Sequence, residues 1–416
     1  MIMTRFVYIL LTYAMLPFAL LHLLWRSLRQ PAYLKHIPER FGFYGEAPFH
    51  SVIWLHAVSV GETRAAEPLI KALRKMHPDH WVLLTHMTPT GREAGERLFG
   101  DNVLRCYLPY DFPQGVERFL RHFKPAVGVL LETEIWFNLI RLCRAQNIPL
   151  YLVNARLSEK SAARYARFAN FTRPALQTLK GIAAQTQQDA QRLRALGAAK
   201  VEVTGSLKFD VTPPASQLAL GEELRRRFGA RLVFLAASTR EGEETLVLEA
   251  VARTVVPNLL TVIVPRHPQR FDEIASLLQS RGIAFKRRSE NPQQVDNVQV
   301  LLGDSMGEMF AYLAACDIAF VGGSLLPYGG QNLLEACAMG KPVLIGPHTY
   351  NFAEAAELAV RAGAAMRVAD ANELARAIQT LFADEKKRQA MGRAGRAFIA
   401  VHQGATQKLL KLISFK

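Results

Sequence analysis

The sequence has little cysteine. Its 416 residues include four, Cys106, Cys143, Cys316 and Cys337, and no two of them form a CxxC pair. Disulfide-built domains and structural zinc sites need paired cysteines, so the sequence argues against both. We expect the soluble part of the chain to fold in a reducing compartment.

Several motifs of nucleotide and metal chemistry are missing as well. The chain has no Walker A loop, no GxGxxG after the first expected strand, and no DxD or HExxH spacing. These absences argue against an ATPase or a dehydrogenase, and we expect no bound metal and no cofactor. The nearest acidic fragment, VADANE, is expected to start a late helix with Asp370 as its N-cap. No repeat of solenoid period is visible.

Acidic residues are fewer than basic ones. The chain has 51 Lys and Arg against 36 Asp and Glu, a formal net charge of +15. Such an excess suits a polyanionic partner: nucleic acid, an anionic membrane or a phosphorylated substrate. The basic residues are spread along the chain without a nucleic-acid motif or interleaved aromatics. We therefore expect an anionic membrane surface as partner, and no nucleic acid.

One long apolar run stands near the start of the chain. Residues 6–25 contain no Asp, Glu, Lys or Arg. A helix of about 20 residues covers roughly 30 Å, the thickness of the hydrocarbon layer of a bilayer. Pro17 is expected to kink this helix, and Trp25 to lie at the membrane interface. The basic residues that follow place the body of the protein in the cytoplasm by the positive-inside rule: Arg26, Arg29, Lys35 and Arg40.

Residues 1–28 are therefore predicted to form a retained anchor in the inner membrane. The same run could be a signal peptide, but the apolar region of a signal peptide is usually shorter and ends in a small-residue cleavage site, which this chain lacks. It could also form a helix buried in a core, or a helix lying in the membrane interface.

The rest of the chain alternates between apolar, strand-like runs and helical stretches. Several strands read as continuous apolar runs, as expected of a parallel sheet covered on both faces. The pattern predicts an α/β domain over 29–210, a linker with a short helix over 211–230, and a second α/β domain over 231–416. Two doubly wound units imply two Rossmann-like domains facing a cleft, with ligands at the carboxyl ends of the strands.

In the first domain Glu62 is the candidate base. The stretch WLHAVSVGETRAAEPLI reads as a strand, a Gly-containing turn and a helix that begins near Glu62. A carboxylate there tends to stay ionised, the form that accepts a proton. The alternative is an ordinary first-turn glutamate. Glu132 and Glu134 form a second acidic pair, which either raise each other's pKa or cap the helix that follows.

The second domain carries a pattern suited to a nucleotide. Glycines at 322, 323, 329 and 330 would let backbone N–H groups approach an anion at the start of the next helix. Glu335 in that helix could bind ribose hydroxyls, and Arg266 and His267 between two prolines could donate to a phosphate or a base. Alternatively, the glycines only make tight turns and Glu335 favours the helix dipole.

Taken together, these motifs resemble one family. The segments HAVSVGE, LETEIWFNLI, VNARLSEKS, GSLKFD, ASTREGEE, PRHPQRF, GDSMGEM and FVGGSLLPYGGQNLLEACAMGKPVLIGPHTYNF are similar to those of the transferases of 3-deoxy-D-manno-octulosonic acid (Kdo), glycosyltransferase family 30. The resemblance is ordered and covers nearly the whole chain. It implies the GT-B fold, the donor CMP-Kdo in the C-terminal domain, a lipid A precursor as acceptor at the N-terminal domain, and metal-independent inversion in lipopolysaccharide assembly.

The resemblance also implies roles for single residues. Glu62 matches the general base. The donor-binding motifs hold Arg266, His267, Gly322, Gly323, Ser324, Asn332 and Glu335. Further cleft residues are expected at Lys208, Glu132, Glu134, Arg156, Ser238, Met306 and Gly307. Two positions depart from the family pattern, Val58 and Phe137, and Phe137 stands where a proline is expected, so the start of that helix could differ.

Two other functions remain open from the sequence. One is another GT-B enzyme that uses a nucleotide-activated sugar such as a UDP-sugar. The other is a membrane-anchored nucleotide-binding protein without catalysis. The sequence does not set the number of Kdo residues added.

Overall fold

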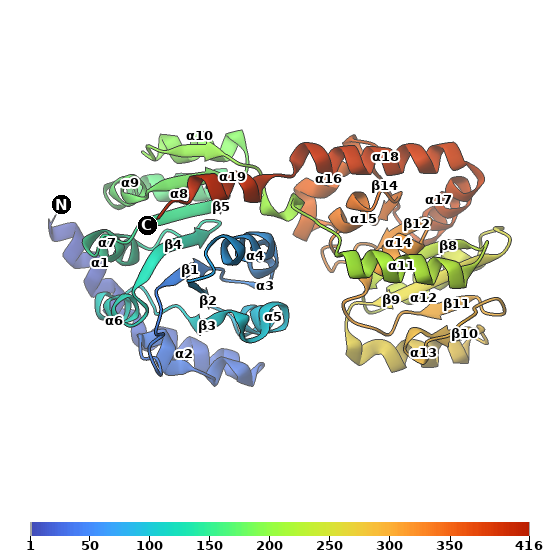
Figure 1. Cartoon of the computed structure of the whole chain (residues 1–416), viewed down its shortest axis with the longest axis horizontal. Coiled ribbons are helices and arrows are strands. Elements are labelled where there is room, and N and C mark those ends of the chain that lie inside the picture. The colour runs from blue at the N-terminus through green and yellow to red at the C-terminus, as the bar shows by residue number, and fades with distance from the viewer. Residues whose placement is uncertain (1, 416) are drawn as a thin grey trace. The chain divides into compact units, whose positions relative to one another are not determined.

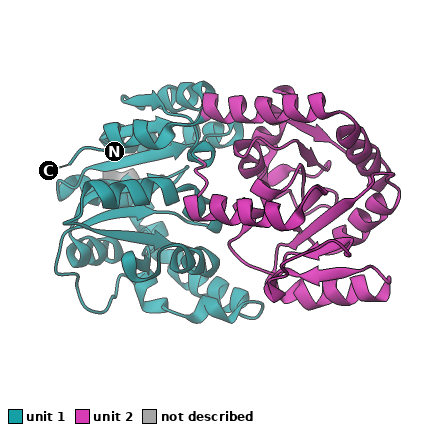
Figure 2. Cartoon of the chain, turned by 45° about the vertical axis from the view of Figure 1, so that its right-hand side comes forward, with its two compact units in different colours: residues 1–210, 403–416 teal, residues 211–402 magenta. Residues whose placement is uncertain are grey.

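The computed structural model describes residues 2–415, with side chains from residue 5 onward. It divides into two compact units (Figure 2). Unit 1 comprises Met1–Asp210 and Gln403–Lys416, and unit 2 comprises Val211–His402.

Unit 1 is built on a parallel sheet of seven strands in the order β3-β2-β1-β4-β5-β6-β7. Its strands are β1 (Val52–His56), β2 (Trp81–His86), β3 (Leu104–Tyr107), β4 (Pro125–Leu131), β5 (Leu150–Ala155), β6 (Gly181–Ala184) and β7 (Val201–Val203). Alternate residues of β1 enter two different cores, Val52 and Trp54 one, Ile53 and Leu55 the other. The sheet is thus buried on both faces, as the continuous apolar runs predicted.

Helices cover both faces of this sheet (Figure 1). They are α1 (Ile2–Ala14), α2 (Leu16–Ser27), α3 (Val60–Ala65), α4 (Glu67–Met76), α5 (Pro89–Phe99), α6 (Pro113–Phe123), α7 (Phe137–Ala145), α8 (Glu159–Arg167), α9 (Ala169–Thr178), α10 (Gln187–Ala195) and α19 (Ala405–Leu412). Short 3-10 helices lie at η1 (Pro31–Leu34), η2 (Ile37–Phe41), η3 (Gly100–Asn102) and η4 (Leu207–Phe209).

Unit 2 repeats the architecture with a parallel sheet of seven strands in the order β10-β11-β9-β8-β12-β13-β14. Its strands are β8 (Leu232–Thr239), β9 (Leu259–Pro265), β10 (Phe285–Arg287), β11 (Val300–Leu302), β12 (Ile318–Val321), β13 (Val343–Ile345) and β14 (Ala365–Arg367). The helices are α11 (Ala215–Phe228), α12 (Glu243–Ala252), α13 (Phe271–Ser280), α14 (Met309–Ala315), α15 (Leu334–Ala338), α16 (Ala353–Arg361), α17 (Ala371–Ala383) and α18 (Glu385–His402), with 3-10 helices η5 (Pro268–Arg270), η6 (Arg288–Glu290) and η7 (Tyr350–Phe352). Asp370 caps α17 as predicted, since its carboxylate accepts from the N–H groups of Asn372 and Glu373.

The chain is divided differently from the sequence-based boundaries at two places. The stretch expected to be a linker is mostly α11, which belongs to unit 2. The end of the chain, assigned by sequence to the second domain, belongs to unit 1. There Leu409 and Ile413 enter the core that also contains Leu69, and the Asp210 carboxylate accepts hydrogen bonds from the start of α19. The apolar face of α19 is therefore buried by a domain some 190 residues earlier in the chain.

The apolar N-terminal segment consists of two consecutive helices, α1 and α2, which are separated only at Met15. Pro17, two residues later, lacks the N–H that would bond to the preceding turn, which explains the break. Arg5–Ser27 is long and apolar enough to cross a membrane, with a mean hydropathy of 2.0, and it is the one such helix among the described residues. Only 6% of it is buried, which excludes a core helix.

Candidate active site

Glu62 lies in the first turn of α3, directly after the β1 strand. Ser59 is the N-cap of this helix, and its hydroxyl accepts from the Glu62 N–H at 3.4 Å and donates to Glu62 Oε1 at 2.8 Å. The Val58 N–H donates to Glu62 Oε2 at 2.8 Å. This arrangement resembles a capping box, which explains locally why the helix starts here. The side chain is held in one orientation by two hydrogen bonds from the turn.

The environment of Glu62 changes the expected protonation state. Burial, aided by the charges of Glu132 and Glu134, raises its pKa from the ordinary 4.5 to about 7, although the hydrogen bonds from Val58 and Ser59 act in the opposite direction. The expectation that a carboxylate at this helix N-terminus tends to stay ionised is therefore not met, because burial outweighs the local donors. A carboxylate that titrates near neutral pH is well matched to general-base catalysis.

Glu132 and Glu134 follow β4 and lie near Glu62. Glu132 has a left-handed backbone with φ of 59°, and its N–H donates to the Val153 carbonyl at 2.9 Å. Trp136 Nε1 donates to Glu134 Oε2 at 2.6 Å. Burial is the largest cause of a raised Glu134 pKa, and the Glu132 charge adds to it. Within this pair, the Glu132 charge thus raises the pKa of Glu134.

The interpretation that this pair caps the next helix is wrong. Helix α7 begins at Phe137, two residues later than the sequence suggested, and its first amides are satisfied from elsewhere. Asp111, in the loop before α6, accepts from the N–H groups of Asn138 at 3.0 Å and Leu139 at 2.8 Å. Sequence reasoning missed Asp111, since nothing local links it to a helix 26 residues later.

In unit 2 the backbone amides of the Gly-rich loop after β12 bind a side chain of the protein itself. The Glu243 carboxylate, from the start of α12, accepts hydrogen bonds from the backbone N–H groups of Gly323 at 2.5 Å, Ser324 at 2.9 Å and Leu325 at 2.9 Å. It also accepts from the Arg240 N–H at 2.9 Å. Of the four glycine amides expected to approach a donor phosphate, that of Gly323 thus already donates to a buried side chain of the protein.

The rest of this loop is closely packed. A Cβ at Gly322 would lie 2.6 Å from both the Ser238 carbonyl oxygen and the Thr239 Cα. Ser324 is fully buried; its hydroxyl donates to the Val321 carbonyl and accepts from the Gly346 N–H. Ser238, at the end of β8, has a φ of 56°. The loop is therefore a rigid support, and its side chains at these positions are engaged in the fold.

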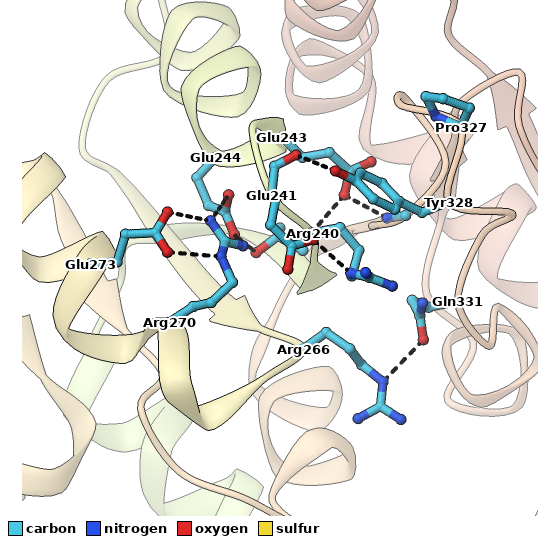
Figure 3. A network of polar contacts seen from close by, with 12 residues as sticks. Arg240, Glu241, Glu243, Glu244, Arg266, Arg270, Glu273, Pro327, Tyr328 and Gln331 are labelled. Atoms are coloured by element: carbon cyan, nitrogen blue, oxygen red, sulfur yellow. Dashed lines mark hydrogen bonds and ion pairs between the residues drawn. The ribbon is translucent and has the colours of Figure 1, made fainter. Parts of the chain in front are cut away.

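Cationic side chains gather at the carboxyl ends of β8 and β9. Arg240 lies with its guanidinium 4.4 Å from the centre of the Tyr328 ring and pairs with the exposed Glu241. Arg266 Nε donates to Gln331 Oε1 at 3.1 Å (Figure 3). Burial lowers the pKa of the neighbouring His267, and the charges of Arg240 and Arg266 lower it further. His267 is thus neutral at pH 7, beside two permanent positive charges.

A buried ion pair fixes the base of this cluster. Arg270 donates to both oxygens of Glu244, at 2.7 and 3.0 Å, and to Glu273 (Figure 3). The Thr239 hydroxyl also donates to Glu244, at 2.6 Å. Bidentate pairs of this kind hold both partners in one geometry. These hydrogen bonds connect the end of β8 to the starts of α12 and α13. Arg240, which follows β8 directly, is therefore attached to a well-ordered backbone.

Asn332 and Glu335 lie together at the start of the short helix α15. Asn332 Nδ2 donates to Glu335 Oε1 at 2.9 Å, and Asn332 Oδ1 accepts from the Leu334 N–H. Glu335 is in the first turn, as predicted, but the helix has only five residues. The amide therefore both caps the helix and orients the carboxylate.

The remaining predicted residues lie on loops of both units. In unit 1, Arg156 is exposed after β5, and Lys208 lies half-buried in η4. In unit 2, Met306 is 53% exposed and Gly307 has a φ of 82° with open space around its Cα. Within residues 2–415 no three His, Cys, Asp or Glu side chains gather in a way that could hold a metal ion.

Two parallel, doubly wound units with polar groups at the carboxyl ends of their strands define a glycosyltransferase-like architecture of the GT-B class. A solved structure confirms the fold alone: the UDP-GlcNAc 2-epimerase of Neisseria meningitidis, bound to UDP-GlcNAc, is 17% identical with a TM-score of 0.56, over 87% of this chain and 99% of its own.

Sequence comparisons define the family. Residues 35–211 match the model described as 3-deoxy-D-manno-octulosonic-acid transferase (kdotransferase), and residues 232–398 match glycosyl transferases group 1. The chain is 46% identical to a 3-deoxy-D-manno-octulosonic acid transferase of Bordetella pertussis, over 93% of this chain and 94% of that protein. It is 38% identical to the transferase of the same name from Haemophilus influenzae, over 99% and 98% of the two chains. The chain belongs to the Kdo transferase family and is a glycosyltransferase.

Proposed function

We propose that this enzyme transfers Kdo from CMP-Kdo to a lipid A precursor, with inversion at the anomeric carbon and without a metal. Glu62 is the general base. The observation that carries this proposal is the Glu62 carboxylate itself, buried, oriented by the Val58 N–H and the Ser59 hydroxyl, and titrating at about 7. The names of the relatives support Kdo as the transferred sugar and, through it, a place in lipopolysaccharide biosynthesis.

The proposed reaction is a single displacement. Glu62 takes the proton from an acceptor hydroxyl as its oxygen forms a bond to the anomeric carbon. The bond from that carbon to the phosphate oxygen breaks, and CMP leaves with the electron pair. Attack from the face opposite the leaving group gives inversion. At neutral pH about half of the Glu62 carboxylates are ionised, so the base is available without a metal to activate it.

The donor's negative charges are proposed to meet side chains rather than the Gly-rich loop. Because Glu243 already accepts from the amides of Gly323 and Ser324, these amides serve the loop's own structure. Arg240 and Arg266 supply the positive charge at the same strand ends. They would bind the phosphate or the sugar carboxylate and stabilise the charge that develops on departing CMP. Asn332 and Glu335 are proposed to bind the ribose hydroxyls.

The acceptor is proposed to be held by unit 1 at the cytoplasmic face of the inner membrane. The exposed apolar N-terminal helix supplies the attachment, and the net charge of +15 suits an anionic lipid surface and a phosphorylated acceptor.

The test is mass spectrometry of products from purified full-length enzyme, CMP-Kdo and a tetraacylated lipid A precursor. A mass increase of one or more Kdo units is expected, and the number of units counts the additions. UDP-sugars are offered in parallel. A product from a UDP-sugar, or none from CMP-Kdo with folded enzyme and intact substrates, would overturn the proposal.

A further inference from the structure

The N-terminal helices α1 and α2 contact unit 1 along one continuous stripe. Side chains on this stripe are partly or fully buried, and those on the other side are exposed. The shielded positions are spaced three to four residues apart, as on one face of a helix: Tyr8, Ile9, Thr12, Tyr13, Leu16, Ala19, Leu23 and Ser27. The stripe covers about 19 residues, or roughly 29 Å of helix.

Specific contacts hold the first half of the stripe on unit 1, and burial marks its end. Near its start, the Tyr8 hydroxyl donates to Asp111 Oδ2 at 2.7 Å, and its ring packs on Phe137 at 5.4 Å between centres. Tyr13 packs on Phe112 in the same way at 5.7 Å. Near its end, Leu23 is 4% exposed. The helix therefore lies along the surface of unit 1 (Figure 1).

The opposite face is apolar and exposed. Its large side chains are between 48% and 83% exposed: Phe6, Val7, Leu10, Leu11, Met15, Phe18, Leu21, Leu24, Trp25 and Leu28. Soluble proteins rarely leave so many neighbouring apolar side chains in water. The exposed basic side chains of Arg5, Arg26 and Arg29 stand near the two ends of this segment in the sequence, and exposed Lys35 follows η1; such charges match anionic lipid head groups.

A helix that crosses the bilayer cannot keep one face in contact with unit 1 and also bury its apolar face in lipid. A crossing helix would carry the contacting surface of unit 1 into hydrocarbon over most of the membrane thickness, with Asp111 and its hydrogen bonds. Leaving the surface instead would strip Asp111 of its Tyr8 donor and expose the rings of Phe112 and Phe137. A helix that lies flat keeps every contact and buries only the apolar face.

We propose that the N-terminal helix lies in the plane of the membrane interface, docked on unit 1, with both ends on the cytoplasmic side. The occupant of its apolar face is one leaflet of an anionic bilayer. Among the alternatives that the sequence leaves open for this segment, the proposal selects the helix that lies in the membrane interface over an anchor that crosses the bilayer. This proposal depends on the proposed function at one point only, the location of the acceptor, which would lie in the same leaflet.

The docking contact also reaches the acidic cluster near Glu62. Asp111 joins the Tyr8 hydroxyl to the first turn of α7 through the Asn138 and Leu139 amides. Trp136, the N-cap residue of α7, donates to Glu134, whose charge raises the pKa of Glu62. A chain of contacts through α7 thus connects the Tyr8 hydroxyl to the loop that carries Glu134.

Topology is tested by labelling in cells. A short polar N-terminal extension with a single cysteine is added to the full chain, in which all four native cysteines are buried. A membrane-impermeant maleimide is applied to spheroplasts and to inverted membrane vesicles. Lys386→Cys, exposed in unit 2, is the control for the cytoplasmic side. Labelling of the extension only in inverted vesicles, like the control, is expected; labelling in intact spheroplasts would overturn the flat orientation. Neither outcome depends on catalysis, so this experiment tests the helix orientation independently of the product assay that tests the proposed function.

The docking contact is tested with two tyrosine variants. Tyr8→Phe removes a donor to Asp111, whereas the Tyr13 hydroxyl is buried without a hydrogen-bond partner, which makes Tyr13→Phe a matched control. Amide hydrogen exchange at residues 138 and 139 should accelerate by about tenfold in Tyr8→Phe bound to phosphatidylglycerol vesicles, and stay unchanged in Tyr13→Phe. Equal protection in both variants would show that the helix is not docked on Asp111 in the membrane.

Discussion

Replacing Glu62 by glutamine tests the mechanism most directly. Glutamine keeps the size of the side chain and an oxygen that can accept from the Val58 N–H, but it cannot accept a proton. Loss of a general base costs about 100- to 10,000-fold in turnover, or roughly 3–5 kcal/mol of activation free energy. CMP affinity, measured by calorimetry, should stay unchanged, because unit 2 carries the proposed donor site.

The pH dependence gives the same experiment a second readout. Since Glu62 must be ionised to act, wild-type turnover should rise with pH through about 7 and then level off, following its pKa. The glutamine variant should lack that rise. A rise centred near the ordinary value of 4.5 would show that burial does not perturb this carboxylate as the structure implies.

The pH dependence of stability reports the pKa of Glu62 without a measurement of catalysis. The folded-state pKa is raised, so between pH 4.5 and about 7 the folded protein binds more protons than the unfolded chain. The free energy of unfolding should therefore fall as pH rises through this window, by at most about 3 kcal/mol from Glu62, and stay level above it. Glu62→Gln should lose this part of the slope in denaturant titrations.

A matched control separates the base from an ordinary first-turn glutamate. Glu67 is also in the first turn of a helix, α4, and pairs only with the exposed Lys71. Glu67→Gln should change turnover by less than about twofold, since exposed pairs of this kind contribute little. If Glu62→Gln turned over as fast as Glu67→Gln, the proposed mechanism would be refuted.

Four further predictions concern unit 2 and the metal. Gly322→Ala forces a Cβ against Ser238 and should destabilise the protein by about 1–3 kcal/mol in thermal unfolding, whereas Gly45→Ala, with open space around it, should stay within about 0.5 kcal/mol. Glu243→Ala leaves buried amides without an acceptor and should cost at least about 2 kcal/mol in the same assay; an unchanged melting temperature would contradict its structural role. Arg240→Gln should weaken CMP-Kdo binding about tenfold by calorimetry, with an unchanged fold by circular dichroism, and equal affinity would remove Arg240 from the donor site. Turnover should survive EDTA, and a loss restored by added Mg²⁺ would contradict the metal-free mechanism.

Much of the architecture could be predicted from local pattern. The strands VIWLH and LVFLAAST are continuous apolar runs because both faces of a parallel sheet are buried, and the pattern predicts both. The short strands β3, β10 and β14 escape prediction, since three or four residues with partly exposed side chains carry little periodicity. Helix α19 is assigned to the wrong domain for a different reason: its apolar face looks the same whichever core buries it.

Some features of the candidate site could likewise be predicted from the sequence, and others depend on the fold. The sequence alone determined that Glu62 follows a strand at a helix start, that Arg266 and His267 follow another strand, and that residues 6–25 form an apolar run, because composition and spacing fix these features. Only the tertiary structure decided what surrounds them. The pKa of Glu62 depends on burial and on carboxylates 70 residues away. The amides of Gly323 and Ser324 are filled by Glu243, 80 residues earlier. The apolar helix meets Asp111 through Tyr8, 103 residues before it. Each of these depends on contacts between distant segments, and such contacts exist only once the chain is folded.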